Sequence, residues 1–179
     1  MLLGLCPQFV HNTKEVVQLS IVIPTFNNAP VIANCLRHVR DYFGSMGSEI
    51  ELILVDDGSD DLTVSRARQL EPGIKVLELK PKRGKSYAIR RGVLASAGER
   101  ILVLSVERGF HIEPLRRLEA RLDQGAELAI GAQLPSTRLQ RLMQWIGVQR
   151  RYRDEMLMTR QAGLDILGQS RKDRHFEPE

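Results

Sequence analysis

Short apolar runs alternate with amphipathic stretches along most of this chain. The runs have the length and the aliphatic, β-branched content of buried strands, and they lie at 19–24, 50–55, 74–79, 101–104 and 128–130. Between them, apolar residues recur at the three- and four-residue spacing of helices that bury one face. Strands that alternate with helices in this way are typical of βαβ units. The sequence therefore predicts an α/β fold with a doubly wound, mainly parallel sheet and helices on both faces.

Prolines, glycines and short polar residues mark the expected helix boundaries. Pro30 opens the first helix, and Ser59 or Asp60 is expected to cap a second helix that runs to about residue 70. Two later helices are expected at about 86–97 and 114–124.

The same pattern divides the chain into three parts. Residues 1–18 form an extension, residues 19–135 a single α/β domain, and residues 136–179 a basic amphipathic helix with a polar tail. Within the last part, arginines interleave with apolar residues over 138–153. This composition suits a helix lying on an anionic membrane surface. It equally suits a helix packed on the sheet with its arginines in water, and both interpretations stay open.

Composition fits one globular domain and points to an anionic partner. The 179 residues are 42% hydrophobic, which allows a sizeable core. The net charge is +4, but basic residues gather at 80–91 and 138–153 while 56–61 is acidic. Such local asymmetry favours an anionic small ligand or an anionic surface over nucleic acid.

Cysteine content and hydropathy indicate the cellular compartment in which the protein is expected. Cys6 and Cys35 lack the spacing of a metal site and suggest no disulfide framework, so a reducing compartment is expected. The opening MLLGLCPQF is too short to span a bilayer and has no basic leader, and no other stretch is long and apolar enough. We expect a cytoplasmic protein, peripheral to the inner face of a membrane if the basic helix binds lipid.

Polar residues follow three of the predicted strands. Because the carboxyl ends of parallel strands meet at one edge of a sheet, these residues are expected to share a crevice. Its members are Pro24, Thr25 and Asn27 after the first strand, Asp56 and Asp57 after the second, and Ser105 and Glu107 after the fourth.

Basic residues from the loop and helix after the third strand are expected to reach the same crevice. They include Lys82, Arg83, Lys85 and Arg90. Carboxylates on one side suit a base, a ribose or a metal ion, and cations on the other side suit phosphate. A nucleoside diphosphate needs both. The plainer alternatives are that the aspartates only form a turn and a helix cap, and that Lys85 and Arg90 lie on a solvated helix face.

Four sequence motifs, in this order and spacing, resemble those of the family 2 glycosyltransferases. They are IVIPTFNN, ELILVDDGSDD, RGKSYAIRRG and the strand with an acidic end that follows AGER. The likeness covers about 19–130 and is greatest to the polyprenyl-phosphate branch, such as the dolichyl-phosphate glucosyltransferases. It implies a Rossmann-like GT-A fold and a nucleotide-sugar site.

The resemblance also implies roles for individual residues. Asp56 or Asp57 would hydrogen-bond the base or the ribose. Ser105 belongs to the expected nucleotide-sugar site as well. Pro24, Thr25 and Asn27 would line the nucleoside pocket, and Lys85 and Arg90 would lie near the diphosphate.

This chain departs from the family at the expected metal site. Family members usually end the fourth strand in Asp-x-Asp, whose last carboxylate holds Mg²⁺ or Mn²⁺, but this chain has Ser105-Val106-Glu107. The resemblance therefore implies Glu107 as the ligand of a divalent cation, with one charge fewer beside it. The basic pair Lys82 and Arg83 could partly stand in for a metal ion.

No catalytic residue is assigned from the sequence. An inverting transferase needs a base near the acceptor hydroxyl, although a phosphate acceptor is already a nucleophile and needs none. Candidates after residue 130 are Asp154, Glu155, Asp165 and Asp173, and none lies in a recognisable motif.

Two functions remain as hypotheses. The first is transfer of a sugar, with inversion, from a nucleoside diphosphate sugar to an acceptor such as a polyprenyl phosphate. The second is a catalytically impaired module that binds a nucleotide sugar or a partner, which Ser105 and the short C-terminal part favour. A nucleotidyltransferase is disfavoured because the first strand ends in PTFNN, without a glycine-rich turn.

Overall fold

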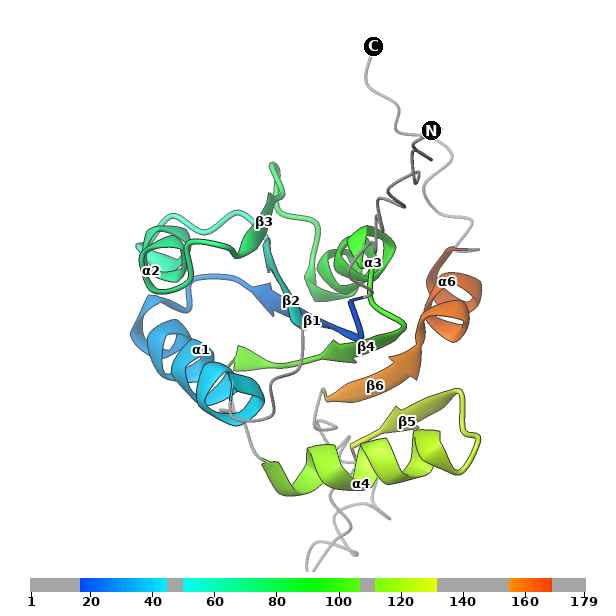
Figure 1. The fold of residues 1–179 in the computed structure, drawn as a ribbon. Helices are drawn as coiled ribbons and strands as arrows, with labels where there is room; N and C mark the ends of the chain where they lie inside the picture. The colour runs from blue at the N-terminus through cyan, green and yellow to red at the C-terminus, as the bar shows by residue number, and fades with distance from the viewer. Residues whose placement is uncertain (1–16, 45–49, 107–111, 132–154, 169–179) are drawn as a thin grey trace, which may run out of the picture.

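Six strands form one mixed sheet in the computed structural model, which describes residues 17–44, 50–106, 112–131 and 155–168. The strands are β1 (Leu19–Thr25), β2 (Ile50–Asp56), β3 (Lys75–Glu78), β4 (Arg100–Val103), β5 (Leu128–Ile130) and β6 (Met156–Thr159). They lie in the order β3-β2-β1-β4-β6-β5 (Figure 1). The first four strands are mutually parallel, as predicted.

Helices cover both faces of this sheet, which confirms the predicted α/β class. They are α1 (Ala29–Gly44), α2 (Thr63–Leu70), α3 (Lys85–Ala95), α4 (Ile112–Asp123) and α6 (Arg160–Gly168). Helices α3 and α6 pack together on one face, while α1 and α4 lie on the other (Figure 1). Helix α2 packs beside α1.

The sequence pattern misses strand β6. This strand runs antiparallel to both β4 and β5 and separates them in the sheet. Residues 156–168, which the sequence analysis places in a polar tail, thus form a strand and a helix. Four residues are too few for periodicity to separate a strand from a helix. The basic helix expected over 138–153 lies outside the described residues.

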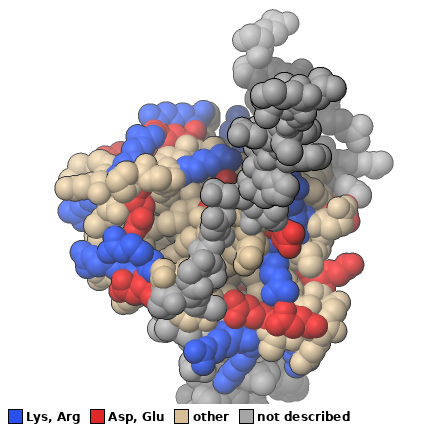
Figure 2. All heavy atoms as spheres, in the orientation of Figure 1, with Lys and Arg blue, Asp and Glu red and all other residues tan. Residues whose placement is uncertain are grey.

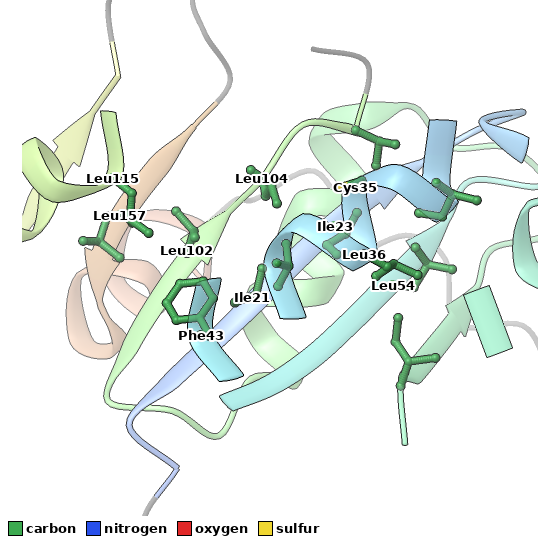
Figure 3. Close-up of a cluster of buried hydrophobic side chains, with 14 of the residues drawn as sticks. Ile21, Ile23, Cys35, Leu36, Phe43, Leu54, Leu102, Leu104, Leu115 and Leu157 are labelled. Carbon is green, nitrogen blue, oxygen red and sulfur yellow. The ribbon is translucent and has the colours of Figure 1, made fainter. Parts of the chain in front are cut away.

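Buried side chains from alternate positions of the strands form two cores. Figure 3 shows the core between the sheet and helices α1 and α4, where Ile21, Leu102 and Leu157 meet Leu36 and Leu115. Side chains of the intervening positions pack against α3 and α6 in the second core. Because both faces are covered, the central strands read as continuous apolar runs rather than as alternating ones.

Gly92 allows α3 to lie directly on β1. A Cβ atom at this position would come within 2.2 Å of Val22 Cγ1 and 3.0 Å of Val55 Cγ2. Both valine side chains are fully buried in close-packed surroundings, so neither can move away cheaply. The absence of a side chain at residue 92 therefore sets the distance of α3 from the sheet.

Candidate functional site

A pocket of about 240 Å³ opens at the carboxyl edge of the sheet, between the ends of β1 and β4 and the start of α3. It brings together five of the residues predicted for the site. These are Pro24, Thr25, Asp57, Lys85 and Ser105. Parallel strands that end together explain this convergence, because the loops and the helix start that follow them lie at the same edge of the sheet.

Asp57 holds the loop between β3 and α3 in place. Its Oδ1 atom accepts a hydrogen bond of 2.7 Å from the backbone N–H of Arg83, and its Oδ2 atom accepts one of 2.9 Å from Gly84 N–H. Gly84 has a φ of 93°, a conformation that suits glycine. A carboxylate can accept about four hydrogen bonds. Asp57 therefore orders the loop and keeps acceptor capacity toward the pocket.

Asp56 stabilises the turn that follows β2 and does not line the pocket. Its carboxylate accepts hydrogen bonds from the backbone N–H of Ser59, at 2.9 Å, and from the Ser59 hydroxyl. The hydroxyl in turn accepts a 2.9 Å hydrogen bond from the N–H of Asn27. The two neighbouring aspartates thus have separate tasks, and of the two only Asp57 lines the pocket.

Asn27 connects the turns after β1 and β2 and also lies outside the pocket lining. Its φ is 51°, a left-handed conformation that asparagine tolerates. Its Oδ1 atom accepts a 3.1 Å hydrogen bond from the N–H of Asp60. Asn27 therefore holds together the two turns beside the pocket and does not line it.

Asp61, rather than Ser59 or Asp60, accepts hydrogen bonds from backbone N–H groups at the first residues of α1 and α2. Its Oδ2 atom accepts a 3.0 Å hydrogen bond from Ala29 N–H, and its Oδ1 atom accepts one of 2.9 Å from Thr63 N–H. Desolvation opposes ionisation, but these hydrogen bonds, that of the Thr63 hydroxyl and the nearby Arg66 charge hold the pKa of Asp61 below its usual value. The predicted cap was wrong because Ser59 is engaged by Asp56.

Some of the basic residues predicted for the site line the pocket, and Arg90 instead contacts helix α6. Lys85 and Lys82 line the pocket, and the Lys82 ammonium lies 3.2 Å from the centre of the Phe26 ring. Arg90, by contrast, donates a 2.7 Å hydrogen bond from Nε to the backbone oxygen of Leu167 in α6. Arg90 is not among the described pocket residues.

Phe26 and Asn28 line the pocket but were not assigned a role from the sequence. Phe26 and Lys82 lie together at the wall, and Asn28 accepts hydrogen bonds of 2.9 Å from the Thr25 hydroxyl and 3.1 Å from Phe26 N–H. The available signal for Phe26 in the sequence was an aromatic residue directly after an apolar strand. In the structure its side chain is 38% exposed. The contact with Lys82 joins two distant loops and has no local signature.

The described part of the pocket does not by itself fit a divalent cation. Ser105 is buried at the end of β4 and brings a hydroxyl, and Asp57 brings a carboxylate that already accepts backbone hydrogen bonds. Across the described ranges, no three His, Cys, Asp or Glu side chains group as a metal site. Glu107, the predicted metal ligand, lies outside the described residues.

Of the four base candidates, the structure describes Glu155 and Asp165, and neither of these two lines the pocket. Asp154 and Asp173 lie outside the described residues, and Asp165 accepts a 3.0 Å hydrogen bond from Gln161 on α6. Glu155 is buried just before β6. Its Oε2 atom lies 3.6 Å from the point where a Cβ atom of residue 131 would stand, so this carboxylate lies beside Gly131, directly after β5.

Residues 20–167 match the family model described as Glycosyl transferase family 2. The chain belongs to this family. It is 26% identical, over 125 residues, to a dolichyl-phosphate beta-glucosyltransferase of Dictyostelium discoideum. That alignment covers 63% of this chain but only 38% of the relative, so the chain spans well under half of the relative's length.

Solved glycosyltransferase structures share the fold, which agrees with the expected GT-A type. The mannosyltransferase PcManGT of Pyrobaculum calidifontis, in complex with GDP-Man and Mn²⁺, superposes with a TM-score of 0.63 at 18% identity, covering 87% of this chain and 48% of that one. A glucosyl-3-phosphoglycerate synthase of Mycobacterium tuberculosis, in complex with Mn²⁺, UDP and phosphoglyceric acid, gives 0.59 at 21% identity, with coverages of 80% and 56%.

Proposed function

We propose that this family 2 glycosyltransferase chain binds a nucleoside diphosphate sugar in the pocket and transfers the sugar to a polyprenyl phosphate. The observation that carries the proposal is the convergence of Asp57, Lys85 and Ser105 on one pocket at the carboxyl edge of the sheet. A carboxylate beside cations is the combination that a nucleoside diphosphate requires.

The nucleoside would bind at the end of β1 and the phosphates at the start of α3. Pro24, Thr25 and Phe26 form the wall near Asp57, whose remaining acceptor capacity suits an N–H of the base or a ribose hydroxyl. Lys85 opens α3, where the end of the helix dipole is positive and favours a phosphate group. Asp56, Asn27 and Arg90 would act indirectly, by holding the loops and α3.

A phosphate acceptor is already a nucleophile and needs no general base. Its oxygen would attack the anomeric carbon of the donor sugar, forming the new C–O bond as the bond to the diphosphate breaks. The nucleoside diphosphate leaves with the electron pair, and the configuration inverts. The acceptor class rests on the likeness to a dolichyl-phosphate enzyme.

Divalent cations in similar structures support the expectation of Mg²⁺ or Mn²⁺ as a cofactor. Such an ion would supply positive charge near the leaving diphosphate. Glu107 remains its proposed ligand, and the residues described in the pocket would do the binding and positioning.

The alternative is a module that binds a nucleotide sugar without turnover, which Ser105 favours because it replaces a carboxylate at the expected metal site. Calorimetry with UDP- and GDP-sugars, followed by a transfer assay with a short polyprenyl phosphate, separates the possibilities. Binding together with a glycolipid product supports the transferase, and binding without product supports the module. If no donor binds, the proposed function is wrong.

We propose further that the chain works at the inner face of a membrane, as a lipid acceptor requires. Within the described residues, no helix has the length and apolar character to cross a bilayer. On the face shown in Figure 2, basic and acidic side chains are interspersed. The proposed contact is the segment 138–153, whose arginines interleave with apolar residues in the sequence. Co-sedimentation should rise with the anionic lipid content of liposomes and fall with salt. Equal binding to neutral vesicles would contradict this contact.

A further inference from the structure

The described part of the pocket wall carries more positive than negative charge. Its charged side chains, among the described residues, are Lys82, Lys85 and Asp57. Backbone N–H groups of Arg83 and Gly84 already donate to the Asp57 carboxylate, at 2.7 and 2.9 Å. Among the described residues, the wall therefore carries two ammonium groups and one carboxylate that already accepts backbone hydrogen bonds.

This set of groups suits a diphosphate better than a metal ion. Mg²⁺ and Mn²⁺ prefer several oxygen ligands with carboxylates among them. The described lining supplies Asp57 and the hydroxyls of Thr25 and Ser105. Ammonium groups, by contrast, bind phosphate oxygens directly through charge-assisted hydrogen bonds.

The Phe26 ring fixes the position of the Lys82 ammonium. The Nζ atom lies 3.2 Å from the ring centre, within the range of a cation–π contact. Phe26 follows β1 and Lys82 belongs to the loop after β3, so the contact joins two sides of the pocket. A lysine held in this way loses less conformational entropy when it binds a ligand.

The start of α3 adds to the positive potential beside these lysines. Gly84 is the N-cap residue and supplies no side-chain cap, and Lys85 is the first residue of the helix. The N-terminal end of a helix attracts anions. Lys82, Lys85 and the helix end thus lie along one stretch of chain that Asp57 holds at the pocket.

We infer that Lys82 and Lys85 neutralise the diphosphate of the donor, so that the nucleoside diphosphate binds in the absence of a divalent cation. This inference rests on the proposed function and concerns donor binding, not transfer. To the Lys85 of the proposed function it adds Lys82, which Phe26 holds at the pocket wall, as a diphosphate-binding residue.

Calorimetric titration of UDP and GDP, each in EDTA and in MnCl₂, tests the inference on the full chain. We expect one nucleotide to bind in EDTA with a Kd within about threefold of its value in Mn²⁺. Lys82→Gln should weaken that binding about tenfold in EDTA, as expected for the loss of one charged contact. Lys80→Gln is the matched control, because Lys80 is exposed in the same loop and does not line the pocket.

The outcomes separate this inference from the proposed function. Binding that requires Mn²⁺ overturns the inference and leaves the proposed function standing. An equal Kd for Lys82→Gln and Lys80→Gln also overturns it. If neither nucleotide binds with or without Mn²⁺, the proposed function itself is wrong. Circular dichroism of both variants establishes that each is folded.

Discussion

At the residue scale, the acidic stretch after β2 acts mainly through the backbone. Asp56 accepts hydrogen bonds within its own turn, Asp57 holds the loop before α3, and Asp61 receives the N–H groups at the starts of α1 and α2. The sequence predicted a functional cluster here, and the structure shows how the cluster builds the pocket. Only Asp57 combines this structural role with a place in the pocket lining.

Asp61 should make stability depend on pH. Its pKa lies below the usual value in the folded chain, since hydrogen bonds and Arg66 outweigh desolvation. Its contribution is therefore complete above the unfolded pKa of about 4 and is lost as pH falls through the folded pKa. Asp61→Asn should unfold at lower urea than the unmodified chain at pH 7, and the difference should shrink as the pH falls below 4. A difference that stays constant down to pH 2.5 would contradict this role.

At the element scale, helix α3 connects the core to the pocket. Its first residue, Lys85, lines the pocket, its middle lies on β1 at Gly92, and Arg90 ties it to α6. Strands β1 to β5 and helices α1 to α4 could be predicted because prolines, glycines or short polar residues mark where their apolar patterns begin and end. Strand β6 and the Arg90 contact could not, because both depend on residues far apart in the sequence.

Gly92→Ala should destabilise the protein and disturb the pocket. The new Cβ would meet Val22 Cγ1 at 2.2 Å, and overpacking of a closed core costs about 1–3 kcal/mol. Gly44→Ala is the control, because a Cβ there has no neighbour within 4 Å. Urea denaturation should show a lower free energy of unfolding for Gly92→Ala alone. An equal loss of unfolding free energy in both variants would mean that α3 does not need to lie this close to β1.

At the scale of the whole molecule, the chain is a three-layer domain whose pocket depends on an intact sheet edge. The predicted class and the parallel strands are confirmed by the structure, and five of the predicted site residues line one pocket. Asn27, Asp56 and Arg90 lie elsewhere because neighbouring residues in a turn or helix point in different directions. Sequence spacing identifies the turn, but the tertiary hydrogen bonds decide which side chain enters the pocket.

The thiol of Cys35 should report on opening of this domain. It is buried between α1 and the sheet, and burial raises its pKa to about 12. In a Cys6→Ser variant, a thiol reagent at pH 8 should react with Cys35 slowly in the native protein and rapidly in urea. Fast labelling of the native protein would contradict a closed core on this side of the sheet.

Calorimetric titration of UDP-glucose and GDP-mannose tests the central claim most directly. The chain should bind one of these donors, and Lys85→Gln should weaken that binding about tenfold because a charged contact to phosphate is lost. Arg91→Gln, an exposed change in the same helix, should leave the Kd unchanged. Failure to bind either donor, or equal binding by the two variants, would contradict a nucleotide-sugar site in this pocket.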